Sequence, residues 1–196
     1  MIKVLFTKGN HKLPKTTYIL NTGSATDCPS RKLGLCQCPD KCYAMKAEKQ
    51  YPAVLSFRRK QREVFTLLSA EELADSLLNS SRRARVYKME SFRFSEAGDF
   101  ENQKDVEKMA LLCKILTSNG VQCYGYTART DLDLAPLIGA STVNVSNDFG
   151  RWAEKGANRF QAVEEYSSGS NHCMMNCAIC HKCATCKGRT IEVKIH

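Results

Sequence analysis

The sequence lacks any long hydrophobic run. No apolar stretch approaches the roughly 18–20 residues that a membrane-spanning helix needs, and the opening residues 1–12 contain no signal-peptide core. Internal repeats and low-complexity linkers are also missing. We therefore expect a single cytoplasmic domain over residues 1–196 that makes no contact with a membrane.

The composition is ordinary apart from charge and cysteine content. Hydrophobic residues make up 43% of the 196 residues and charged residues 25%, which argues against a disordered or fibrous chain. The formal net charge is +9, and it is uneven, because residues 1–65 contain 13 Lys/Arg and 4 Asp/Glu while the remainder contains 16 of each. This basic first third is either a solvated face or a positive field that attracts nucleic-acid phosphates or another anion.

The 11 cysteines fall into two groups. Disulfides are rare in a reducing cytosol, and thiols two or three residues apart suit a single metal ion or cluster better than a bridge between distant elements. We expect Cys113 and Cys123, which stand alone on apolar stretches, to be core residues. The first group is Cys28, Cys36, Cys38 and Cys42, and the second is Cys173, Cys177, Cys180, Cys183 and Cys186.

The second group has the spacing of an iron–sulfur loop. A structural zinc site normally takes two Cys-x2-Cys pairs separated by a dozen or more residues, whereas here the pairs abut within residues 173–189. Tight runs of this kind wrap a 4Fe-4S cluster, in which each iron takes one thiolate. We predict such a cluster with zinc as the alternative, and we interpret His172 and His181 as surface residues. The predicted ligands are Cys173, Cys177, Cys180 and Cys183, with Cys186 spare or substituting.

The first group allows two kinds of cluster. Cys38-x3-Cys42 has loop spacing, and a helix that starts at Tyr43 would direct its positive end at the bound thiolates. Three thiolate ligands would leave one iron open to chelate a substrate or cofactor, which marks a catalytic cluster. Four would make the cluster structural or electron-transferring, and the spacing leaves both alternatives open.

Strands alternate with helices along the chain. This pattern indicates an α/β fold, either a compact partial (βα) barrel or an open, mostly parallel sheet with helices outside and cysteine-rich loops near both ends. The predicted strands are residues 2–6, 18–21, 85–89 (or as far as 94), 121–126, 142–146, 160–164 and 190–195, and the predicted helices are 43–68, 71–78, 101–116 and 131–138.

Polar residues follow three of these strands, at residues 95–99, 127–129 and 146–148. Functional side chains in such folds lie at the carboxyl ends of the strands. Two of these carboxylates, Asp99 and Asp148, also stand near possible helix starts, so helix capping is the alternative interpretation.

Two basic segments stand out, Phe57–Arg62 within a helix and Ser81–Arg85 before a strand. Their cations could contact nucleic acid, or they could offset the negative charge of a thiolate cluster. Aromatic residues are sparse between them, so no stacking platform for single strands is evident.

Several short motifs, in order and at similar spacing, resemble the phage gene product 88 proteins, which are related in turn to radical-SAM-like barrels. The similar stretch runs from about residue 9 to residue 186. The motifs are Cys28-Pro29, Cys38-x3-Cys42-Tyr43-Ala44, Tyr51-Pro52, Glu96-Ala97-Gly98-Asp99-Phe100, Tyr124-Gly125-Tyr126-Thr127 and Cys177-Ala178-Ile179-Cys180-x2-Cys183.

The resemblance implies a partial βα barrel with an N-terminal cluster on Cys28, Cys38 and Cys42 and an auxiliary cluster on the C-terminal thiols. Cys36 and Cys186 fall outside the family pattern. The radical-SAM signature Cys-x3-Cys-x2-Cys is absent near the N-terminus, so use of S-adenosylmethionine is one alternative. If that cofactor binds, its ammonium would meet the Glu96–Asp99 turn, which includes Gly98, its carboxylate Arg129, and its ribose Ser146, Asn147 and Asp148.

The sequence is therefore compatible with three functions. The first is a radical-SAM-like redox enzyme of unknown substrate. The second is a non-catalytic iron–sulfur protein that binds nucleic acid or a host protein. The third is a zinc-stabilised module that binds nucleic acid. The polar strand ends favour the enzyme, and the basic first third favours the other two. A phage origin would place the protein in the host cytoplasm.

Overall fold

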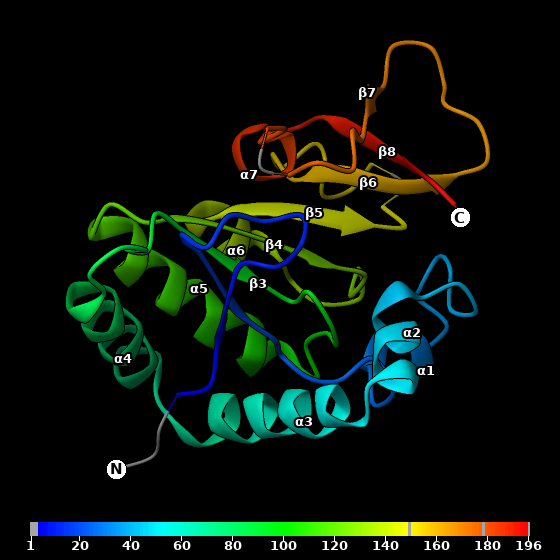
Figure 1. Cartoon of the computed structure of the whole chain (residues 1–196). Coiled ribbons are helices and arrows are strands. Elements are labelled where there is room, and N and C mark those ends of the chain that lie inside the picture. Colours follow the sequence, from blue (N-terminus) through cyan, green and yellow to red (C-terminus); the bar gives the residue numbers. More distant parts are fainter. Residues whose placement is uncertain (1–3, 149, 178, 196) are drawn as a thin grey trace.

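The centre of the molecule is a mostly parallel sheet. The structure, a computed structural model, describes residues 4–148, 150–177 and 179–195. Its eight strands follow the order β1-β2-β3-β4-β5-β6-β8-β7, with β1 antiparallel at one edge and every other pair parallel (Figure 1). This confirms the predicted α/β class with an open sheet. The strands are β1 (Thr7–Lys8), β2 (Thr17–Leu20), β3 (Ser91–Phe94), β4 (Gln122–Thr127), β5 (Thr142–Ser146), β6 (Asn158–Val163), β7 (Asn171–His172) and β8 (Thr190–Lys194).

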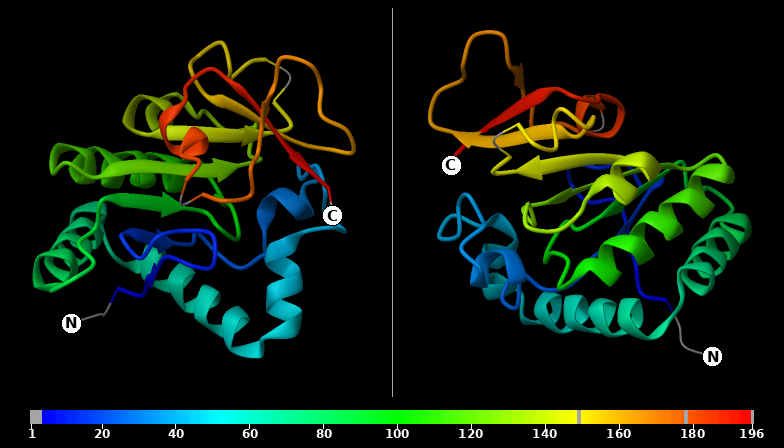
Figure 2. Two further views of the ribbon diagram at one scale, coloured as in Figure 1. Left: turned by 45° about the horizontal axis from the view of Figure 1, so that its top comes forward. Right: turned by 180° about the vertical axis from the view of Figure 1, so that it is seen from behind.

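The larger helices cover one face of the sheet. From β2 to β6, sheet neighbours are also neighbours along the chain, so every crossover steps in the same direction. Right-handed crossovers that all step one way leave their helices on one side, as in a (βα) barrel. Figures 1 and 2 show α3 to α6 on that side, with β6 to β8 and α7 away from it. The helices are α1 (Pro29–Lys32), α2 (Tyr43–Gln50), α3 (Pro52–Leu67), α4 (Ala70–Arg83), α5 (Gln103–Ser118), α6 (Ala135–Ala140) and α7 (Lys182–Thr185).

The apolar core lies between this face and the helices. Phe92 and Phe94 of β3 are fully buried in it, together with Phe65 of α3. Gly125 of β4 makes room for one of these rings, because a Cβ at that position would lie 2.2 Å from the Phe94 side chain. The tight contact explains why a strand otherwise built from bulky residues carries a glycine here.

Several predicted boundaries are wrong. The predicted helix 43–68 breaks into α2 and α3, because Pro52 begins α3 and forces an extended backbone on Tyr51 (φ −129°, ψ 95°). Residues 85–89 form no strand, and β3 starts only at Ser91. The predicted strand at residues 2–6 lies partly outside the described residues, and its remainder is irregular up to Thr7. The predicted helix 131–138 begins at Ala135, where Pro136 occupies its first turn.

The opposite face of the sheet is polar. Along β4, Cys123 faces the helices, whereas Tyr124 and Tyr126 line a cavity on the opposite face together with Arg93 of β3. This alternation follows from the two-residue period of a strand. In a closed barrel this face would be the interior, and we call it the inner face.

Candidate functional site

The C-terminal thiol segment, residues 173–186, is hydrogen-bonded across the inner face of the sheet. Side-chain amides from three successive strands donate to its backbone carbonyls. Gln122 of β4 binds the Ala184 carbonyl at 2.8 Å, and Asn144 of β5 binds that of Cys183 at 2.8 Å. Asn158 of β6 binds the carbonyl of Cys186 at 2.7 Å. These bonds place the second cysteine group against the sheet.

Asn144 and Asn158 are missing from the sequence prediction. Both are fully buried and joined to each other by a hydrogen bond of 3.1 Å. A buried amide must find partners because an unsatisfied polar group is costly. Their one signal in the sequence is an asparagine inside or beside an apolar strand, which identifies no partner.

Four of the five C-terminal thiols line one small cavity, and Cys186 does not. Burial chiefly raises the pKa of the Cys183 thiol to about 11; neighbouring thiols also raise it, while a hydrogen bond with Tyr126 lowers it. Burial likewise raises the pKa of Cys177, against the nearby charge of Arg93. The four thiols around the cavity are Cys173, Cys177, Cys180 and Cys183.

These thiols share a cavity without yet forming a coordination site. Over residues 4–148, 150–177 and 179–195, no three cysteine, histidine or carboxylate side chains stand in an arrangement that would hold one metal ion. The four sulfurs belong to one short segment, and the amide bonds hold only its last part, from Cys183 onward. The first residue of the segment is also held, because the Cys173 N–H donates to the Glu192 carbonyl of β8 at 2.7 Å.

The N-terminal thiol loop, residues 28–42, lies at the carboxyl edge of the sheet. It follows β2, and Cys28 and Cys42 occupy the positions just before α1 and α2. Gln37 makes two hydrogen bonds with the backbone of Ala162 in β6, at 3.2 and 3.0 Å. Asn147, after β5, donates to the Leu35 carbonyl at 3.0 Å. The loop is therefore tied to the ends of two strands far away in the sequence.

The thiols of this loop are partly buried near one another. Burial, and then Asp99, raise the pKa of the Cys28 thiol to about 11. Burial also raises the pKa of Cys36, and the neighbouring thiols Cys38 and Cys42 add to this effect. Cys36 therefore lies close enough to two of the predicted ligands, Cys38 and Cys42, for them to raise its pKa.

A buried ion pair fixes the backbone just before the same loop. The Glu48 carboxylate accepts hydrogen bonds from the backbone N–H groups of Ala25 and Thr26, at 2.7 and 2.9 Å. Arg58 donates to the same carboxylate at 2.9 Å and to the Ala44 carbonyl at 2.8 Å. Burial raises the pKa of Glu48, but these donors outweigh it and hold the pKa below its usual value.

Comparison with known proteins assigns a family to this arrangement. Residues 3–146 match the family model described as Gene product 88. The chain belongs to the Gene product 88 family. The match spans β1 to β5 and the N-terminal thiol loop, and it ends before the C-terminal thiol segment. No curated protein and no solved structure matches the chain.

In this member of the Gene product 88 family, the buried Asp99 has partners within the chain. Its carboxylate accepts hydrogen bonds from the Ser30 hydroxyl at 2.6 Å and the Thr127 hydroxyl at 2.7 Å, and from the Ala128 N–H at 2.8 Å. Burial raises its pKa. Asp99 thereby joins α1, β4 and the end of β3 at one point. Arg129 is also engaged, because it pairs with Asp131.

The remaining predicted cofactor residues lie at the same edge. Asp148 accepts hydrogen bonds from the backbone N–H groups of Trp152 and Ala153, which lie in a turn, so it closes a turn before β6 and does not cap a helix among the described residues. Glu96 accepts from the Asn10 amide at 2.6 Å. Gly98 has a φ of 70° and packs against Gly23 so closely that a Cβ would lie 2.5 Å from its carbonyl carbon. Ser146 ends β5, next to Asn147.

The basic stretch in the N-terminal third is largely paired inside the Gene product 88 chain. Arg58 binds the buried Glu48, and Arg59 binds Asp27 at 2.7 Å. Arg62 binds Glu101 at 2.8 Å and Asp105 at 2.6 Å. Of the four basic residues within positions 57–62, only Lys60 has no ion pair in the described structure. This pairing weakens the interpretation of the stretch as a nucleic-acid contact. In the part of the chain that the structure describes, no helix is long and apolar enough to span a membrane.

Proposed function

We propose that this protein is an iron–sulfur protein with one 4Fe-4S cluster on each group of thiols. The observation that carries the proposal is that Cys173, Cys177, Cys180 and Cys183 are among the residues that line one small cavity, while the fifth thiol of the segment lies outside it. The donor set suits the group, because four thiolates in a compact loop are the ligands of such a cluster. Zinc is the alternative metal for the same thiols.

The N-terminal thiol loop is the proposed catalytic site. It follows the first parallel strand and lies at the carboxyl edge, where βα folds place their active sites. Cys28, Cys38 and Cys42 would be the ligands, with Cys36 able to replace one of them. A cluster with three protein ligands supplies an electron for reductive cleavage of S-adenosylmethionine.

The polar residues at this edge would then bind that cofactor. Glu96 and Gly98 border the turn after β3, and Ser146 and Asn147 end β5. Asp99, Arg129 and Asp148 already make hydrogen bonds within the chain, so we assign them the task of holding these loops in place. Asp99 does so most directly because it binds α1 at the start of the thiol loop.

Anaerobic purification tests the metal assignment. We expect a brown protein with about eight irons per chain, four for each cluster. Replacing Cys173, Cys177, Cys180 and Cys183 together by serine should remove about half of the iron. Cys186→Ser is the matched control, since it alters a thiol of the same segment that lies outside the cavity, and it should keep the full iron content. A colourless protein with stoichiometric zinc would refute the proposal.

A second experiment separates the catalytic part from the metal part. Reduction in the presence of S-adenosylmethionine should yield 5′-deoxyadenosine, and Cys42→Ser should abolish this product while retaining the C-terminal iron. Comparison of Cys36→Ser with Cys38→Ser identifies the third ligand. An iron-loaded protein that forms no more product than a cluster-free control would refute cofactor cleavage and leave an iron–sulfur protein of another kind.

A further inference from the structure

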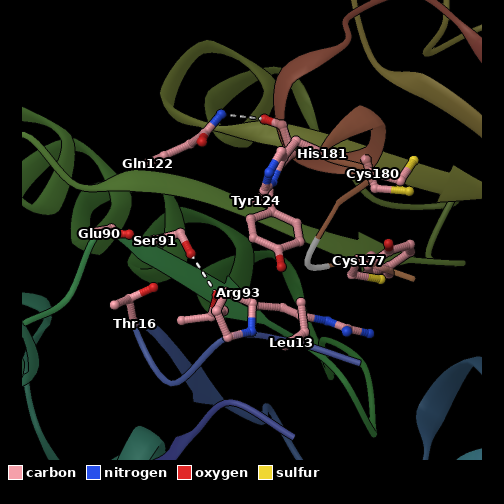
Figure 3. A pocket seen from close by; sticks show the side chains of 15 residues that line it. Leu13, Thr16, Glu90, Ser91, Arg93, Gln122, Tyr124, Cys177, Cys180 and His181 are labelled. Carbon is pink, nitrogen blue, oxygen red and sulfur yellow. Dashed lines mark hydrogen bonds between the residues drawn. The ribbon is translucent and has the colours of Figure 1, made fainter. Parts of the chain in front are cut away.

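A second cavity, of about 120 Å³, lies on the inner face between the sheet and the C-terminal thiol segment. Its walls include Ser91 and Arg93 of β3, Tyr124 of β4, and Cys177 (Figure 3). Cys183 also lines it. An engineered protein cavity of about 150 Å³ takes up benzene, so this space suits a small organic molecule. Unlike an apolar cavity, it has a guanidinium group in its wall.

Arg93 has no carboxylate partner among the described residues. It appears in none of the ion pairs of the chain, although Arg58, Arg62 and Arg129 are all paired. Its Nε is the one buried side-chain nitrogen or oxygen in the described structure that lacks a hydrogen-bond partner. A charge removed from water without a partner is costly. Arg93 is only partly buried as a residue, and its guanidinium stands in the cavity wall without a counter-charge among the described residues.

The neighbours of Arg93 fix its position without neutralising it. Its Nη2 donates to the Tyr43 hydroxyl at 3.4 Å, and the guanidinium carbon lies 4.9 Å from the centre of the Tyr126 ring. Figure 3 shows the guanidinium extending toward the side of the cavity where Cys177 lies, with Glu90 at the opposite side. The Nε edge is thus held in place with no acceptor on it.

We infer that this cavity binds a small carboxylate-bearing molecule, with the carboxylate on the guanidinium of Arg93. A planar carboxylate matches the fork of N–H groups along one edge of a guanidinium. A dianion such as phosphate suits the cavity less well, because Arg93 is its single guanidinium while Glu90 and three cysteines also line it. The inference goes beyond the proposed function, since it rests on the cavity and on Arg93 and needs no metal.

Nuclear magnetic resonance of the Arg93 side chain tests the inference directly. We would record ¹⁵Nε–¹Hε correlation spectra of the labelled, full-length protein while adding acetate, isobutyrate or inorganic phosphate, with sodium chloride at equal ionic strength as the reference. The Arg93 signal is assigned by its loss in Arg93→Lys. We expect a saturable shift with both carboxylates and a weaker response to phosphate. No saturable shift up to roughly 50 mM carboxylate, where even a millimolar site is filled, would overturn the inference.

Calorimetry on two variants measures how much each substitution changes the Kd for isobutyrate. Arg93→Lys keeps the charge but loses the fork, and we expect the Kd for isobutyrate to rise at least tenfold. Arg59→Gln is the matched control, because Arg59 is exposed and paired with Asp27, and its Kd should not change. An unchanged Kd in Arg93→Lys would also overturn the inference. If Arg93→Lys does not fold, Arg93→Gln takes its place both for the assignment of the resonance and for the Kd.

Iron is measured in every sample. A protein without iron that still shows the Nε shift would refute the proposed iron–sulfur function and leave the carboxylate site standing. A protein with both clusters and no Nε shift would refute the carboxylate site and leave the proposed iron–sulfur function standing.

Discussion

The buried pair Glu48–Arg58 offers the sharpest test of how the N-terminal thiol loop is held. We predict that Glu48→Gln lowers the free energy of unfolding by about 3 kcal/mol, because breaking a buried pair leaves an uncompensated charge. The side chains of Glu48 and Arg58 are only 1% and 8% exposed. Glutamine keeps the shape of the side chain, so the loss reports the charge and the two backbone N–H bonds at Ala25 and Thr26.

Chemical denaturation followed by circular dichroism measures this change. Asp27→Asn is the matched control, because Asp27 and Arg59 form an ion pair whose side chains are 45% and 52% exposed. An exposed pair contributes about 0–1 kcal/mol. A loss for Glu48→Gln no larger than that for Asp27→Asn would refute the view that the buried pair holds the loop.

The same pair predicts a pH dependence with a definite sign. The pKa of Glu48 is lower in the folded chain than its usual value of 4.5. Its contribution to stability is therefore fully present above pH 4.5 and disappears as the pH falls through the folded pKa. The wild-type protein should lose stability over this range more steeply than Glu48→Gln. Parallel curves for the two proteins would show that another group controls the acid response.

Two further predictions concern the sheet. Asn144→Ala removes hydrogen bonds to the carbonyls of Gly125 and Cys183. We therefore expect the free energy of unfolding to fall by about 1–3 kcal/mol and a maleimide to alkylate Cys183 faster. An unchanged alkylation rate would contradict the role of the amides. Gly125→Ala should lower the free energy of unfolding by about 1–3 kcal/mol through overpacking against Phe94. Gly139→Ala in α6 is the control, because nothing lies within 4 Å of the new Cβ. It should be neutral or stabilising by up to about 1 kcal/mol. Equal unfolding midpoints for the two glycine variants would contradict the packing argument.

The site could be predicted only in part. The two groups of thiols are contiguous in the sequence, and the structure keeps each group together because short segments cannot separate their own residues far. The amide bonds from Gln122, Asn144 and Asn158 could not be foreseen, since each joins residues at least 28 positions apart. The same holds for Arg93, whose missing partner is visible only when all of its neighbours are in place.

The sequence by itself determined the class of fold and the division of the clustered thiols into two groups. Strand and helix periods are local, and they predicted most of the parallel strands and the helices that connect them. Proline effects are local too, yet the break between Tyr51 and Pro52 was missed because the helical pattern continues on both sides of it. What only the tertiary structure decided is the placement of the two groups, one at the carboxyl edge and one across the inner face. That placement depends on hydrogen bonds between distant segments, which no local pattern in the sequence encodes.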